Sequence, residues 1–144
     1  MRVGIVGSGA VGARCARQLL STEDVHQVVL RDENSEHLRA LSESLGEGAT
    51  VDRGAFTDPL DVDVVVLAGP AGVHAAHAQV FVGRGQPVVS TSDDIADVRA
   101  LLDLDSEATE RAISVVVGAG FAPGLTCVLA THAASRFEIG RAHV

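Results

Sequence analysis

Short apolar runs alternate with segments of helical periodicity along most of the chain. The runs are rich in β-branched residues and apolar on both faces, as strands of a buried parallel sheet are. The six segments expected to be strands are Val3–Val6, Gln27–Arg31, Ala49–Val51, Asp63–Ala68, Pro87–Ser90 and Ile113–Val117.

Between these runs, apolar side chains recur every three or four residues, which is the spacing of one helix face. The sets that show it are Val11/Cys15/Leu19, Leu38/Leu41/Leu45, Val73/Ala76/Val80 and Ile95/Val98/Leu102. Alternating strands and helices with short connections favour right-handed crossovers. The sequence therefore predicts an α/β fold: a Rossmann-type, doubly wound, mostly parallel six-stranded sheet with helices on both faces and strand order 3-2-1-4-5-6.

The first predicted strand runs into a glycine-rich turn, GSGAVG, that has the pattern G-x-G-x-x-G. We expect Gly7 to form the tight turn, Gly9 to leave room for a pyrophosphate, and Gly12 to let the helix approach the sheet. The N–H groups and partial positive charge of a helix N-terminus compensate a diphosphate without lysine, which this chain lacks. The expected cofactor contacts of this turn are Gly7, Ser8, Gly9, Ala10, Val11 and Gly12.

An acidic residue at the end of the second strand is the other part of this fingerprint, about 20 residues beyond the last glycine. Asp32 occupies that position and is expected to accept hydrogen bonds from the adenosine ribose, which favours NAD over NADP. If the strand ends one residue earlier, Arg31 faces the ribose and accommodates the 2′-phosphate of NADP. Glu33 adds negative charge and supports the NAD interpretation.

Small residues follow the fourth and fifth predicted strands. Ala68, Gly69 and Pro70 are expected to line the ribose on the nicotinamide side of the cofactor. Thr91 and Ser92 are expected to cap the next helix, with ligand contact by Thr91 as the alternative.

Length and charge narrow the classes of function. A chain of 144 residues predicts one domain. The net charge of −8 and the scattered arginines disfavour nucleic acid or an anionic membrane as partners. No apolar run approaches the ~20 residues of a membrane-spanning helix. We therefore expect a small-molecule site in a cytoplasmic protein, without a disulfide between Cys15 and Cys127.

Three features have modest interpretations. His74 and His77 share a predicted helix face, but no third ligand has suitable spacing, so we expect no metal site and a solvated or core-edge pair. Cys127 lies in the apolar segment LTCVLA and is expected to be buried. The acidic run Asp103–Glu110 is expected to be a solvated helix face and turn.

The segment VVVGAGFAPGLTCVLA (residues 115–130) resembles the end of the nucleotide domain in saccharopine dehydrogenase-like reductases. With GIVGSGAVG, VVLRDEN and VVVLAGPAGVHAAHA, the resemblance spans nearly the whole chain. It implies NAD(P)-linked oxidoreduction at an amine or imine carbon of an amino-acid-like substrate. Pro123 is expected to start a helix, while Gly118, Gly120 and Gly124 allow close backbone approach beside the nicotinamide.

Members of that family continue into a second domain, and RFEIGRAHV (136–144) resembles its opening strand. We therefore expect residues 1–135 to form an NAD(P)-binding domain, and the chain alone to be inactive. Two alternatives remain: a free-standing NAD(H)-sensing regulatory domain, or the cofactor domain of another two-domain dehydrogenase. Association into a homodimer stays open for each of them.

Overall fold

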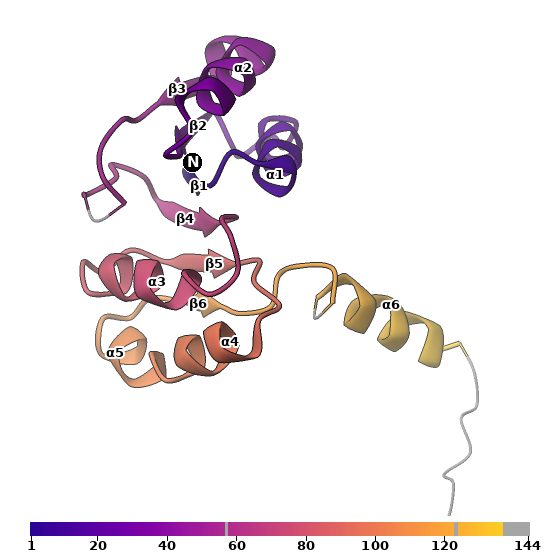
Figure 1. Ribbon diagram of the computed structural model, residues 1–144. Helices are drawn as coiled ribbons and strands as arrows, with labels where there is room; N and C mark the ends of the chain where they lie inside the picture. The colour runs from indigo at the N-terminus through magenta and orange to yellow at the C-terminus, as the bar shows by residue number, and fades with distance from the viewer. Residues whose placement is uncertain (57, 123, 137–144) are drawn as a thin grey trace, which may run out of the picture.

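The computed structural model describes residues 1–56, 58–122 and 124–136, and its core is one parallel sheet. The strands are β1 Arg2–Val6, β2 Gln27–Arg31, β3 Ala49–Val51, β4 Val64–Leu67, β5 Val88–Ser90 and β6 Val115–Val116. Their order is β3-β2-β1-β4-β5-β6, with every pair parallel (Figure 1). The predicted fold class and strand order are therefore confirmed.

The helices follow the strands as the periodicity indicated. They are α1 Ala10–Leu20, α2 Ser35–Leu45, α3 His74–Val82, α4 Ile95–Leu102, α5 Asp105–Glu110 and α6 Leu125–Ala134, with the 3-10 turn η1 Gly46–Gly48 after α2. None of the helices within the described residues is long and apolar enough to cross a membrane.

Alternating side chains of the strands build two cores, one on each face of the sheet. Ile5 and Leu30 pack with α1 and α2 on one face. Val6 and Leu67 pack with α3 and α4 on the other, around the buried ring of Phe81. Because both faces are covered, the carboxyl-terminal edge of the sheet is where loops from several strands meet and a ligand can enter.

Helix α6 lies apart from the sheet (Figure 1), and no residue of this helix is buried. Cys127 is exposed, so the prediction of a buried cysteine is wrong. The apolar pattern indicated burial, but none of the described residues covers the helix. Helix α6 begins at Leu125, after Gly124. Pro123, which was expected to start this helix, lies outside the described residues. Residues 137–144 of the expected opening strand also lie outside them.

Candidate functional site

A cavity of about 620 Å³ opens at the carboxyl-terminal ends of β1, β2 and β4. Eight of the predicted cofactor contacts line it: Gly7, Gly9, Ala10, Val11, Asp32, Ala68, Gly69 and Pro70. The other lining residues are Val6, Glu33, Asn34, His37, Phe56, Val73 and His77. Six predicted contacts lie outside this lining: Ser8, Gly12, Arg31, Thr91, Gly118 and Gly120.

The three glycines of the first turn are needed for different reasons. Gly7 has φ +104°, and a Cβ there would lie 2.6 Å from the backbone of Ala68. A Cβ on Gly12 would lie 1.9 Å from the carbonyl oxygen of Gly7. A Cβ on Gly9, in contrast, would meet no protein atom within 4 Å. Packing therefore accounts for Gly7 and Gly12, whereas the gap above Gly9 is open space in the cavity.

The N-terminus of α1 faces the cavity beside Gly9. Gly9 is the N-cap residue, and no side chain caps the helix. The N–H of Ala13 donates to the Gly9 carbonyl at 2.9 Å, so the N–H groups of the first turn before it have no partner within the helix. Together with the partial positive charge of the helix end, they form a site suited to an anion.

Asp32 lines the cavity beside the glycine-rich turn, which holds its carboxylate. Its Oδ2 accepts hydrogen bonds from the N–H and the hydroxyl of Ser8, the latter at 2.8 Å, and its Oδ1 accepts one from the N–H of Asn34 at 2.8 Å. Burial raises the pKa of this carboxyl, but the bonds from Asn34 and Ser8 outweigh it, so the pKa is lowered. Ser8 thus contributes to the site indirectly, by holding the carboxylate of Asp32.

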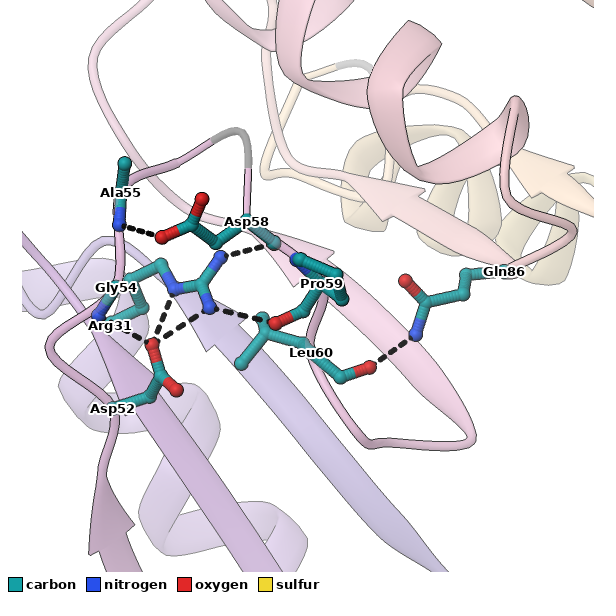
Figure 2. Close-up of polar contacts among 8 residues, drawn as sticks. All are labelled: Arg31, Asp52, Gly54, Ala55, Asp58, Pro59, Leu60 and Gln86. Atoms are coloured by element: carbon teal, nitrogen blue, oxygen red, sulfur yellow. Dashed lines mark hydrogen bonds and ion pairs between the residues drawn. The ribbon is translucent and has the colours of Figure 1, made fainter.

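Arg31 points away from the cavity, which corrects the expectation that it contacts the cofactor. Its side chain is 1% exposed, and its guanidinium bonds to the Asp52 carboxylate and to the carbonyls of Asp58 and Pro59 (Figure 2). Every nitrogen of the guanidinium is already engaged, so this side chain is not offered to a 2′-phosphate.

His74 is buried, not at a solvated or core-edge position as expected. Its Nε2 lies 3.0 Å from the carbonyl oxygen of Gly69, which can only accept, so Nε2 carries the proton. Its Nδ1 accepts from the Ser90 hydroxyl at 2.9 Å. Sequence reasoning missed this role because these partners meet only when β4 and β5 pair. His74 therefore fixes the loop that lines the cavity at Gly69.

Asp97 of α4 is a second buried anchor of the same loop, and sequence reasoning missed it. Its carboxylate accepts from the N–H groups of Gly72 at 2.7 Å and Ala75 at 3.1 Å, and from the Ser92 hydroxyl at 2.8 Å. Burial raises its pKa, but the bonds from Ser92, Ala75 and Gly72 and the proximity of His74 outweigh burial and lower the pKa. Asp97 thereby caps α3, which has no cap of its own.

We expect Asp97→Ala to lower the free energy of unfolding by about 2–3 kcal/mol, because buried donors lose their acceptor. A carboxyl whose pKa is lowered by folding stabilises the protein above its unfolded pKa, and this contribution disappears as the pH falls through the folded pKa. The difference between wild type and variant should therefore shrink below about pH 4. Urea denaturation at pH 7 and at pH 3 measures both effects; equal midpoints at pH 7 would contradict this role.

Thr91 and Ser92 do not cap α4, contrary to expectation. The N-cap residue is Asp94, whose carboxylate accepts from the N–H of Asp97 at 2.9 Å. Thr91 donates its hydroxyl to the Leu67 carbonyl at 3.0 Å and so ties the ends of β4 and β5 together. A carboxylate immediately before an apolar stripe is itself a capping signal, and it could have identified Asp94.

Gly118 and Gly120 lie in the loop before α6. Gly118 has φ +70°, and a Cβ on Gly124 would lie 2.2 Å from the Gly120 carbonyl oxygen and 2.6 Å from that of Gly118. The close approach in this loop is between its own backbone segments. Contact of these glycines with a nicotinamide stays a prediction.

Among residues 1–56, 58–122 and 124–136, no three His, Cys, Asp or Glu side chains converge as a metal site would require. His77 lines the cavity and stacks on Phe56, with ring centroids 4.7 Å apart and an interplanar angle of 14°. Burial lowers the pKa of His77, and the nearby His74 lowers it further. This stack forms an aromatic wall of the cavity.

A parallel sheet of this order, with a glycine-rich turn after β1 and an acid after β2, defines the dinucleotide-binding Rossmann class. The family described as semialdehyde dehydrogenase, NAD binding domain, matches residues 2–116, and the chain belongs to that family. NAD is thus the cofactor of this domain. A comparison with curated protein sequences finds no significant match.

Solved structures of several dehydrogenases share the fold. Saccharopine dehydrogenase from Saccharomyces cerevisiae has a TM-score of 0.75 at 23% identity, covering 94% of this chain and 31% of that one. GenD2 from gentamicin A biosynthesis, solved with NAD, has a TM-score of 0.66 at 24% identity, covering 94% and 40%. scyllo-Inositol dehydrogenase from Lactobacillus casei has a TM-score of 0.63 at 20% identity, covering 81% and 35%. The chain spans about a third of their length.

Proposed function

We propose that this chain binds NAD with its diphosphate over Gly9 at the N-terminus of α1 and its adenosine ribose at Asp32. The observation that carries the proposal is the open space above Gly9, next to N–H groups that have no partner within the helix and near the carboxylate of Asp32, whose pKa is lowered. Ala68, Gly69 and Pro70 then lie beside the ribose on the nicotinamide side. Small side chains there keep the cavity open.

We further propose that the domain serves a dehydrogenase that transfers hydride between NAD and an amine or imine carbon of an amino-acid-like substrate. The G-x-G-F-x-P-G-L motif supports this class. Because the matched structures are about two to three times as long as this chain, we propose that a second unit, following residue 135, carries the substrate and proton-transfer groups.

A second candidate is hydride transfer at an aldehyde or hydroxyl carbon. The family match to semialdehyde dehydrogenases supports it. Assays of the full-length enzyme with an imine-forming amino acid and with an amino-acid semialdehyde distinguish the two candidates. For this chain alone we expect no turnover with either substrate. A change of oligomeric state on adding NADH would instead favour a sensing domain.

We expect NADH to bind more tightly than NADPH by about 1–3 kcal/mol, the scale of one charge-assisted hydrogen bond. The carboxylate of Asp32 accepts from a 2′-hydroxyl but repels a 2′-phosphate. Asp32→Ala should narrow the difference, and titration calorimetry with both nucleotides measures it.

Ser8→Ala is the matched control for this prediction. This variant removes the Ser8 hydroxyl, which donates to Oδ2 of Asp32, but leaves the carboxylate of Asp32 in place. The preference for NADH should therefore persist in Ser8→Ala. Tighter binding of NADPH by the wild-type chain would contradict the role assigned to Asp32.

A further inference from the structure

The aromatic wall of the cavity, formed by Phe56 and His77, depends on an irregular loop. Phe56 belongs to the connection between β3 and β4, whereas His77 lies on α3. The Phe56 ring stacks on His77 and also packs against the core under α3. A connection without secondary structure needs specific contacts to hold an aromatic ring in one place, because ordering its backbone costs about 1–2 kcal/mol per residue.

Arg31 supplies those contacts at both ends of the loop (Figure 2). At the entrance, its Nε and Nη2 lie 2.8 and 2.7 Å from Oδ1 of Asp52. At the exit, its Nη1 donates to the carbonyl of Asp58 at 2.7 Å and its Nη2 to that of Pro59 at 3.1 Å. One side chain thus joins two ends of the loop, on either side of Phe56.

The two acids extend this clamp into the loop. Oδ1 of Asp52 also accepts from the N–H of Gly54 at 2.9 Å, and Oδ2 of Asp58 accepts from the N–H of Ala55 at 2.8 Å. Gly54 and Ala55, which immediately precede Phe56, are therefore held by the same two aspartates that contact the guanidinium of Arg31.

An arginine suits this position better than a lysine would. The planar guanidinium presents donors in fixed directions to three acceptors at once, and it keeps its charge when buried. Arg31 ends β2, whose backbone is paired on both sides, so the clamp starts from a rigid strand. Its own carbonyl accepts from the N–H of Gly7 at 2.8 Å, which links this strand end to the glycine-rich turn.

We propose that Arg31 is a positioning residue of the nucleotide site: it clamps the loop between β3 and β4 so that Phe56, stacked on His77, forms a fixed aromatic wall for the adenine half of NAD. This inference rests on the proposed function. Arg31 does not touch the nucleotide, and its effect passes through Phe56. The adenine base gains a preformed apolar surface instead of having to order the loop on binding.

The test compares Arg31→Gln, Phe56→Ala and the double variant in the full chain, with AMP and NADH as ligands. Arg111→Gln is the matched control, since Arg111 pairs with Glu107 on the surface away from the cavity. We expect each single variant to lower the affinity for AMP and for NADH about tenfold, the scale of one base–aromatic contact. The double variant should lose little more than either single one, because both changes remove the same wall. Arg111→Gln should bind as the wild type does.

Two further readouts separate positioning from a general loss of stability. Hydrogen exchange at the N–H groups of Gly54 and Ala55 should quicken in Arg31→Gln, while exchange in β1 stays slow. The ratio of NADH to NADPH affinity should stay unchanged. If Arg31→Gln does not fold, Asp52→Ala removes the entrance contact from a partly exposed residue and is expected to give the same pattern.

The outcomes are distinct. If folded Arg31→Gln bound AMP and NADH as tightly as the wild type does, this inference alone would be overturned. Fully additive losses of affinity in the double variant would also overturn it alone. A selective loss of NADPH binding in Arg31→Gln would show direct contact with the 2′-phosphate and would also overturn it. A wild-type chain that binds neither AMP nor NADH would overturn the proposed function together with this inference.

Discussion

Gly12→Ala is expected to destabilise the domain by about 3 kcal/mol or more and to remove nucleotide binding, although it adds only a methyl group. The new Cβ would lie 1.9 Å from the Gly7 carbonyl oxygen. That carbonyl cannot retreat easily, because the N–H of Gly7 donates to Arg31 and the residue packs on the backbone of Ala68. The helix would have to move off the sheet. Urea denaturation followed by circular dichroism measures the loss.

Gly69→Ala is the control for this variant. Gly69 also lies at the carboxyl end of a strand and lines the cavity, but a Cβ there meets no protein atom within 4 Å. Its midpoint of unfolding should stay close to that of the wild type. A Gly12→Ala variant as stable as Gly69→Ala would contradict the close packing of α1 on the turn.

Gly9→Val is expected to have the opposite signature: the fold is retained and binding is lost. A side chain at this position meets no protein atom within 4 Å, so the free energy of unfolding should fall by about 1 kcal/mol at most, from the poorer N-cap residue. The same side chain would occupy the space proposed for the pyrophosphate. We expect NADH affinity to fall about 100-fold, equivalent to about 2.7 kcal/mol. Titration calorimetry measures the loss of NADH affinity, and thermal unfolding measures the change in stability.

Ala100→Val adds comparable bulk on an exposed face of α4 and serves as the control for Gly9→Val. It should leave NADH affinity unchanged. If Gly9→Val bound NADH as tightly as Ala100→Val does, the diphosphate could not lie over the N-terminus of α1.

The parts of the fold that sequence could predict are those with a local signal. Alternation of strands and helices indicated the parallel sheet, and the order 3-2-1-4-5-6 was expected as the usual arrangement of a doubly wound sheet. The glycine-rich turn and Asp32 were predicted because their chemistry depends on short spacings along the chain. Gly12 shows this most directly, since the clash that excludes a side chain is with Gly7, five residues away.

Contacts between distant segments could not be predicted in the same way. Arg31 was kept as the alternative to Asp32 for facing the ribose because the end of the strand was uncertain by one residue, but its partners lie 21 to 28 residues later in a loop without periodicity. His74 was expected at a solvated or core-edge position, and its burial could not be predicted because its partner Ser90 comes close only after β4 and β5 pair. Cys127 was expected in a core because its helix is apolar, yet the described residues leave that helix uncovered.

The most direct test of the account is a map of NADH binding on the backbone amides of the wild-type chain by protein NMR. We expect saturable shifts to concentrate at residues 7–12 around Gly9, at Asp32 and its successors, and at Ala68 and Gly69, with little change in α5. Absence of shifts at millimolar NADH, or shifts clustered away from the glycine-rich turn, would contradict the assignment of this cavity as the NAD site.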